Sequence, residues 1–430
     1  MNWKRRLIFW SGAICVGLVA ILFAIACEKA NDLFHKLIDI SPYLPLLLTP
    51  LGLVLIVIIT RKSFPGSQGS GIPQAIASLE LNDKHEVREK VLSLRVTFGK
   101  IVLTIMGLAF GASVGREGPT VQIGASIMHS LGGFAHFPRH YMEKGLILAG
   151  SAAGVAAAFN TPLAGIVFAI EEMSHSFEKH NSTTILMTVI IAGITSLALL
   201  GNYTYFGHTS ASLAFGSEWS VVIVCGIAGG LFGGAFSRFL IEVNKGLTGH
   251  IGAWMRTKPV VFAAACGLIL ALIGLASGNT TYGSGYSEAK SLLNGSVALP
   301  ESYGLLKMTA TIVSYISGIP GGIMAPSLSA GAGLGANIAH LFTSAPAGAV
   351  IILGMVAYFA GVTQAPITAS VIVMEMVDNH EMILPLMAAA FIANGCSRLI
   401  CPAPLYHTLA QQFVRGNVSP TGSHAQITKL

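Results

Sequence analysis

Long stretches without charged residues dominate the hydrophobic pattern of this chain. Apolar residues in these stretches occupy every helical face and Gly and Ala are frequent, whereas strands of a membrane barrel would alternate polar and apolar positions over about ten residues. A hydrocarbon core about 30 Å thick needs roughly 20 helical residues to cross. The pattern therefore predicts an all-α polytopic membrane protein with many transmembrane helices. The uncharged runs are 7–27, 40–60, 118–138, 145–170, 180–217, 259–287 and 308–374.

The composition excludes several classes of protein. Of 430 residues, 53% are hydrophobic and 10% are charged, which rules out a soluble enzyme, a nucleic-acid-binding domain and a disordered chain. The net charge of +6 is assigned to cytoplasmic loops beside the lipid bilayer rather than to nucleic acid. Six cysteines form no Cys-x-x-Cys and thirteen histidines form no His-Glu-x-x-His, so we expect no disulfide framework, metal or cofactor.

Three pairs of segments recur in the same order at nearly constant separation, as in transporters built from two related halves. We expect residues 1–205 and 206–419 to form the two halves of one transmembrane domain. A tail at 420–430 is too short for a soluble regulatory domain. The recurring pairs are 69–75 with 283–289, 115–120 with 321–327, and 159–171 with 362–375.

The distribution of basic residues predicts the orientation of the two halves. Lys84, Arg88 and Lys90 follow the first Gly-Ser-Gly segment, whereas the matching loop of the second half carries only Lys290 before Glu301. Because Lys and Arg stay on the cytoplasmic side, the halves are expected to be inverted. Both chain termini would then lie on the cytoplasmic side of a bacterial-type inner membrane.

Three glycine-proline motifs predict helices that begin inside the membrane. They are Gly-Ser-Gly-Ile-Pro at 69–73, Gly-Arg-Glu-Gly-Pro at 115–119 and Gly-Gly-Ile-Met-Ala-Pro at 321–326. Glycine permits irregular backbone and proline fits the first helical turn. Helix N-termini expose free N–H groups and partial positive charge, so several at one point would bind an anion without a lysine. The alternative is that these motifs only kink continuous helices.

Glutamates near these motifs are candidates for proton chemistry. Glu117 precedes a helix N-terminus, so its carboxylate would occupy the anion site when ionised and leave it when protonated; the alternative is a permanent pair with Arg116. Glu171 and Glu172 end an apolar helix and point about 100° apart, so at most one can face a buried interior as a proton relay. Glu375 is expected to be structural.

These motifs resemble the signature stretches of the CLC chloride channel and transporter family. Asn-Thr-Pro-Leu-Ala-Gly at 160–165, Glu172 and Pro-Leu-Tyr at 404–406 also match, so the resemblance covers nearly the whole chain. It implies an inverted-repeat bundle of tilted and broken helices. It also implies a homodimer in which each subunit holds its own anion pathway.

The resemblance also implies roles for individual residues. Ser70 matches the serine whose hydroxyl contacts the anion, and Tyr406 matches the tyrosine that completes this gate. Gly118 and the backbone amides near Ile323 and Met324 would supply the remaining chloride contacts.

Two matched glutamates imply coupling of chloride to protons. Glu117 matches the gating glutamate of Gly-Arg-Glu-Gly-Pro, and Glu172 matches the internal proton-transfer glutamate found in the family's exchangers and usually absent from its channels. Serine at position 70 favours chloride, since nitrate-preferring members resemble this motif with proline there. The resemblance thus implies a chloride/proton antiporter, with a passive chloride channel of the same fold as the alternative.

The chain departs from the family pattern at a few positions. Gln74 and Ile76 replace acidic residues of some bacterial exchangers, Met324 stands where phenylalanine is common, and Arg95 stands where some have lysine. These departures remove charges from around Glu172, so they bear on proton coupling rather than on anion transport.

Two other classes of membrane protein lack the residues that they need. A hydrolase would need a nucleophile with a base or paired aspartates, and no buried lysine is expected to accompany Ser70. A cation-coupled transporter would favour Asp or Asn at the helix breaks, where this chain has Gly and Pro. We therefore do not expect an enzyme.

Overall fold

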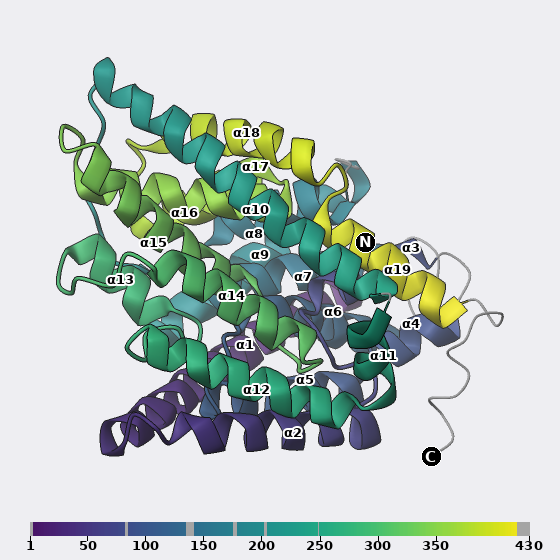
Figure 1. Ribbon diagram of the computed structural model, residues 1–430. Helices are drawn as coiled ribbons and strands as arrows, with labels where there is room; N and C mark the ends of the chain where they lie inside the picture. Colours follow the sequence, from purple (N-terminus) through teal and green to yellow (C-terminus); the bar gives the residue numbers. More distant parts are fainter. Residues whose placement is uncertain are drawn as a thin grey trace.

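The computed structural model describes residues 3–81, 85–134, 142–174, 179–201, 204–247 and 249–418 (Figure 1). Across these ranges the regular structure is helical, without a strand. Six of the described helices are long and apolar enough to cross a membrane. The prediction of an all-α polytopic membrane fold is confirmed.

The N-terminal part of the chain supplies helices α1 to α9. One of them, α8, continues directly into a π-helix, η1, which contains the Glu171-Glu172 pair. The elements are α1 (Trp3–Ile40), α2 (Pro45–Ser63), α3 (Ile72–Glu80), α4 (His85–Val91), α5 (Leu94–Ala109), α6 (Glu117–Phe134), α7 (Met142–Phe159), α8 (Pro162–Phe168), η1 (Ala169–Ser174) and α9 (Lys179–Leu200).

The C-terminal part supplies helices α10 to α19 after a short 3₁₀ turn, η2. The elements are η2 (Ser217–Trp219), α10 (Ser220–Gly246), α11 (Gly249–Thr257), α12 (Pro259–Ala276), α13 (Tyr286–Asn294), α14 (Tyr303–Ile316), α15 (Met324–Leu341), α16 (Ala347–Thr363), α17 (Pro366–Val377), α18 (Ile383–Ile400) and α19 (Leu405–Val418).

The two parts present corresponding helices in the same order. Both α3 and α13 have nine residues, and both α6 and α15 have 18. The helix α6 packs along α7 as α15 packs along α16, and α2 packs against α12. This order agrees with the repeat in the sequence. The division of the domain at residue 205 and the short tail stay predictions, and the tail lies outside the described residues.

Glycines allow the corresponding helix pairs to approach closely. A Cβ built on Gly124 of α6 would lie 2.1 Å from the carbonyl oxygen of Gly150 in α7. In the other half, a Cβ on Gly354 of α16 would lie 2.5 Å from the Cα of Gly335 in α15. Helices in membranes associate through small residues of this kind, so both pairs depend on glycine at the contact.

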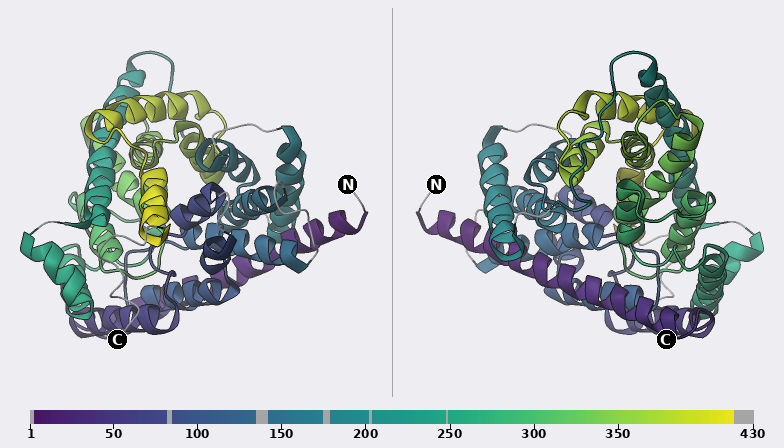
Figure 2. Two further views of the ribbon diagram at one scale, coloured as in Figure 1. Left: turned by 90° about the vertical axis from the view of Figure 1, so that its right-hand side faces the viewer. Right: turned by 90° about the vertical axis from the view of Figure 1, so that its left-hand side faces the viewer.

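The last helix returns to the N-terminal half. Figure 2 shows α1 running obliquely along one side of the molecule and α19 standing upright near the middle of the left-hand view. The helix α19 packs against α3. Tyr406, in the first turn of α19, therefore lies near α3, the helix that starts within the Gly-Ser-Gly-Ile-Pro motif.

Candidate functional site

The loops before α3, α6 and α15 are joined to one another by backbone hydrogen bonds. Gly69 N–H donates to the Ile319 carbonyl at 3.2 Å, and Gly321 N–H donates to the Gly69 carbonyl at 3.2 Å. Gly115 and Gly322 exchange two hydrogen bonds of 2.7 and 2.8 Å. The helices begin at Ile72, Glu117 and Met324. The three motifs thus start separate helices that meet, and the interpretation as mere kinks is wrong.

Glycine is required where these loops meet. A Cβ on Gly118 would lie 2.3 Å from Ser70 Oγ and 3.2 Å from the Cα of Gly322. Gly71 has a φ of +104°, and a Cβ there would lie 2.7 Å from the Gly118 carbonyl oxygen. L-residues with a side chain rarely adopt such a φ. The Ser70 hydroxyl therefore lies against the first turn of α6 because the neighbouring positions have no side chains.

Two buried hydroxyl groups face each other near these helix ends. Ser70 and Tyr406 are each 1% exposed, and their side chains lie beside one another. Beyond their contact with each other, neither hydroxyl has a hydrogen-bond partner within the described ranges. Buried hydroxyls are normally paired, so these two have donor capacity left for a bound species. Ile323 and Met324, also 1% exposed, lie at the start of α15.

The carboxylate of Glu117 lies between the N-termini of α6 and α15. Its side chain is fully buried, and its Oε1 accepts a hydrogen bond of 3.1 Å from the Tyr205 hydroxyl. A Cβ on Gly115 would meet Glu117 Oε2 at 2.3 Å, Pro326 Cδ at 3.2 Å and Ala325 Cβ at 3.3 Å. A carboxyl group therefore occupies the place where two positive helix ends converge.

Arg116 anchors the turn that carries Glu117. Its Nη1 donates to the Ala24 carbonyl of α1 at 2.8 Å, and its guanidinium lies 5.7 Å from the centre of the Tyr205 ring. The arginine thus connects α1, the Glu117 turn and the segment that contains Tyr205.

Glu172 is buried in η1, the π-helix that follows α8. Its side chain is 4% exposed, and its Oε1 has no hydrogen-bond partner in the part of the chain that the structure describes. His407 Nε2 donates to the Glu172 carbonyl oxygen at 2.8 Å. Because His407 follows Tyr406 in α19, this helix connects Tyr406 to the turn that holds Glu172.

Glu171 points to a different neighbour from Glu172. Its two carboxylate oxygens accept hydrogen bonds from the backbone amides of Ile367 and Thr368, at 3.1 and 2.5 Å. These amides belong to the first turn of α17 and have no partner within their own helix. Glu171 therefore caps α17, which agrees with the expectation that only one member of the pair faces the interior.

Glu375 makes the reciprocal contact. Its oxygens accept hydrogen bonds from the amides of Leu163 and Ala164 in the first turn of α8, at 3.2 and 2.7 Å. Each helix therefore ends in a carboxylate that caps the start of the other, so α8 and α17 are antiparallel. The equal proline-to-glutamate spacing of the two segments is explained by this exchange.

We expect Glu171→Ala to destabilise the protein by about 1–2 kcal/mol, because the mutation leaves two amides of α17 without a charged acceptor. Glu171→Gln retains one acceptor oxygen and should lose less. The melting temperature of the purified protein in detergent measures the difference. Exposed Glu381 provides the control: if Glu171→Ala and Glu381→Ala melt alike, the cap contributes nothing.

One expectation about lysine is wrong. Lys100 of α5 is fully buried, and its Nζ donates to the Gly69 carbonyl at 3.1 Å, next to Ser70. The signal in the sequence is a single lysine inside an apolar helix. The ammonium group binds the carbonyl side of the loop, so it holds the Gly-Ser-Gly backbone in place.

The segment before α13, which the sequence pairs with the segment before α3, is closed by side chains. Lys307 Nζ donates to the three carbonyls of residues 281–283, at 3.0, 3.2 and 2.8 Å. Ser329 Oγ donates to the Gly285 carbonyl at 2.8 Å. The loop before α13 is therefore used for packing, whereas the loop before α3 leaves the Ser70 hydroxyl facing Tyr406 of α19.

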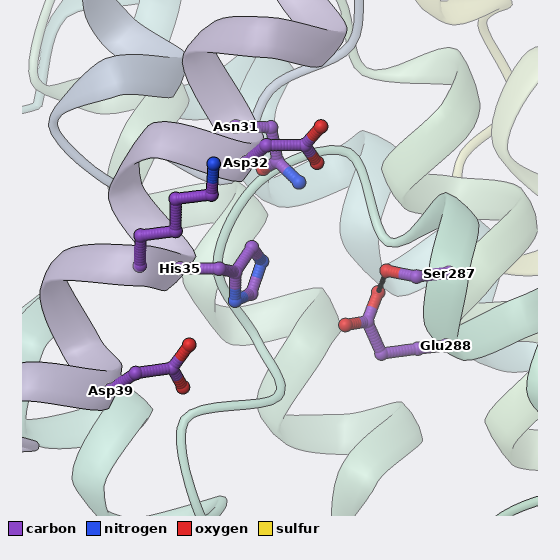
Figure 3. A pocket seen from close by; sticks show the side chains of 7 residues that line it. Asn31, Asp32, His35, Asp39, Ser287 and Glu288 are labelled. Carbon is purple, nitrogen blue, oxygen red and sulfur yellow. Dashed lines mark hydrogen bonds between the residues drawn. The ribbon is translucent and has the colours of Figure 1, made fainter.

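A surface pocket lies away from these residues, between α1 and α13 (Figure 3). Its volume is about 420 Å³. Within it the Ser287 hydroxyl donates to Glu288 at 2.9 Å. None of the residues predicted for anion or proton transport lines it. The lining residues are Asn31, Asp32, His35, Lys36, Asp39, Ser287 and Glu288.

Comparison with known proteins identifies related chains. Residues 52–398 match the family described as voltage gated chloride channel. A structure of a slow cyanobacterial Cl⁻/H⁺ antiporter is 25% identical, with a TM-score of 0.82, over 96% of this chain and 99% of that one. A CLC-type fluoride/proton antiporter is 23% identical, with a TM-score of 0.80, over 94% and 99%. A eukaryotic CLC transporter is 19% identical, with a TM-score of 0.78, over 96% and 75%.

Proposed function

This chain belongs to the voltage-gated chloride channel (CLC) family of multi-pass, anion-transporting membrane proteins, and we propose that it exchanges chloride for protons. The resemblance inferred from the sequence motifs is therefore confirmed at the level of the family. The 25% identical structure described as a Cl⁻/H⁺ antiporter supports the proposal. Chloride and protons are proposed as the transported ions.

The observation that carries the proposal is a pair of buried carboxylates, both close enough to Tyr406 for their charges to reach it. Glu117 lies at the helix N-termini and Glu172 lies in η1, at 0% and 4% exposure. Burying a carboxylate inside a membrane protein costs free energy, so a carboxylate that is retained there indicates a function. A passive channel needs only one such carboxylate, as a gate. A coupled exchanger also needs a second carboxylate that accepts protons.

We propose that the hydroxyls of Ser70 and Tyr406 bind the anion together with the backbone around Gly118, Ile323 and Met324. Free amides at helix N-termini and hydroxyl donors can replace part of the hydration shell of chloride. In this proposal the ionised side chain of Glu117 competes for the same positive helix ends. Protonation removes its charge, so the side chain leaves and an anion takes its place.

A proton would reach Glu117 by a separate route on the cytoplasmic side. The residues proposed to hold chloride near Ser70 and Tyr406 carry no carboxylate, so chloride and protons need different inner paths. Glu172 is proposed to receive the proton from the cytoplasm. Capping of α17 by Glu171 supports this division of roles, since it leaves Glu172 as the buried member of the pair.

We expect Ser70→Pro to shift the preference from chloride towards nitrate, because the mutation removes a hydroxyl donor that suits a small, strongly hydrated anion. Flux from liposomes loaded with each anion measures the ratio. Ser78→Ala in α3, the helix that begins two residues after Ser70, is the control, since the Ser78 hydroxyl donates to the Ala75 carbonyl. An unchanged chloride-to-nitrate ratio in Ser70→Pro would contradict the assignment of Ser70.

A passive chloride channel is the second candidate, favoured by the positions that lack acidic residues. The Gln74 side chain binds the backbone of the loop before α3. Its Oε1 accepts a hydrogen bond from Gly71 N–H at 3.0 Å, and its Nε2 donates to the Gln68 carbonyl at 2.8 Å. Ile76 is 1% exposed. Currents across a planar bilayer separate the candidates, because a pH gradient shifts the reversal potential of an exchanger and leaves that of a channel unchanged.

We also propose a homodimer in a cell inner membrane, with both termini in the cytoplasm. The distribution of Lys and Arg supports the orientation. Apolar side chains exposed beside the reciprocal caps, on α8, α9, α17 and α18, provide a surface that a second subunit could cover. Representative exposed side chains are Leu163, Ile194, Ile367 and Leu384.

A further inference from the structure

A tyrosine outside all the recognised motifs contacts the proposed gate. Tyr205 lies in the segment that connects α9 to η2 and is 3% exposed. Its hydroxyl donates to Glu117 Oε1 at 3.1 Å. The residue therefore reaches the carboxylate from a part of the chain that supplies none of the helix N-termini.

Aromatic packing fixes the position of this hydroxyl. The Tyr205 ring makes edge contacts with Phe159, Phe206 and Tyr286, with centroid distances of 5.6, 5.0 and 4.9 Å. The next residue is fixed as well, because Phe206 N–H donates to the Met376 carbonyl of α17 at 2.9 Å. The donor is thus held in place, and little conformational entropy is lost when it binds the carboxylate.

We infer that Tyr205 is a positioning residue that holds Glu117 in the anion site and sets the pH at which the gate opens. This inference rests on the proposed function of Glu117 as a proton-dependent gate. A hydroxyl binds an ionised carboxylate more strongly than a neutral carboxylic acid. The contact therefore stabilises the blocking, ionised form and must break before the side chain can leave.

Other polar groups around Glu117 are arranged differently. Arg116 on the same turn acts on the carboxylate through its charge, and the backbone amide of Ala325 donates to it. The charge of Glu117 in turn reaches Cys27 of α1 and Tyr406 of α19. Tyr205 contacts the carboxylate directly and lies under the Arg116 guanidinium. Removal of its hydroxyl changes one donor to the gate while the aromatic ring keeps its packing.

The test is Tyr205→Phe in the full-length protein reconstituted in liposomes, with chloride efflux measured across a range of pH. We expect efflux at neutral pH to rise by about three- to tenfold, because a hydrogen bond to a charged group has been removed. The pH of half-maximal efflux should move upwards by about one unit, since the ionised form has lost a donor. Unchanged efflux and an unchanged pH profile would overturn the inference.

Two further variants separate a gate contact from a packing effect. Tyr286→Phe is the matched control, because its ring packs against Tyr205 and its hydroxyl interacts with Lys290 at 3.4 Å; we expect a wild-type pH profile. In a Glu117→Ala background, Tyr205→Phe should have no further effect. An equal acceleration in that background would show that Tyr205 does not act through Glu117.

The same set of variants distinguishes failure of the inference from failure of the proposed function. If Glu117→Ala loses its pH dependence but Tyr205→Phe matches the wild type, the inference about Tyr205 is wrong and the gate stands. If Glu117→Ala retains wild-type pH dependence and proton coupling, the proposed gate is wrong and the inference is overturned with it.

Discussion

Glu117→Ala should continue to transport chloride while losing both its pH dependence and all coupled proton movement. The carboxylate of Glu117 lies where the N-termini of α6 and α15 converge and is fully buried. Alanine can neither compete with the anion there nor carry a proton. Chloride flux and external pH, recorded together from liposomes, measure the two effects.

Two variants test whether the charge of Glu117 causes this result. Glu117→Gln keeps the size of the side chain but cannot ionise, so we expect the same loss of proton coupling. Glu375→Gln alters a glutamate that caps α8 and should remain coupled. Wild-type coupling in either Glu117 variant would remove this residue from the mechanism.

Glu172→Gln should keep chloride transport and abolish proton movement. The reason is that protons need a titratable group on the cytoplasmic side, and no carboxylate is among the residues proposed to hold chloride. Glu172 is buried, with an oxygen that has no partner among the described residues. The ratio of proton to chloride flux should fall to the background of protein-free liposomes.

The neighbouring glutamate is the matched control for this prediction. Glu171→Gln differs by one position, and its side chain caps α17 instead of facing the interior. We expect it to retain both fluxes. If Glu172→Gln still moves protons against a gradient, a water chain or another side chain performs the transfer and the proposed relay is wrong.

Local sequence rules were sufficient to predict where the key helices begin. Glycines followed by proline indicated the starts of α3, α6 and α15, because these residues determine backbone geometry without reference to the rest of the chain. The family resemblance implied that Ser70 and Gly118 belong to one anion site, and the two residues lie in contact. The convergence of these helix ends was expected of a transporter built from two related halves, and backbone hydrogen bonds join the three loops.

Contacts between distant segments could not be predicted in the same way. Tyr205 contacts a carboxylate 88 positions earlier in the chain, and its own segment has no motif. The π-helix η1 also lacks a local signal. The hydrogen bonds that fix it come from α17 and from His407. The position of Lys100 within an apolar helix is visible in the sequence. Its partner, the Gly69 carbonyl, is not, because that contact depends on how α5 packs.

The most direct test of chloride/proton exchange uses the unmodified protein in liposomes. A chloride gradient is imposed, no pH gradient is present at the start, and the external pH is recorded while an ionophore clamps the membrane potential. Exchange predicts that protons move against their own developing gradient, opposite to chloride, until the two gradients balance. Chloride movement without any change in external pH would contradict exchange and establish a passive channel.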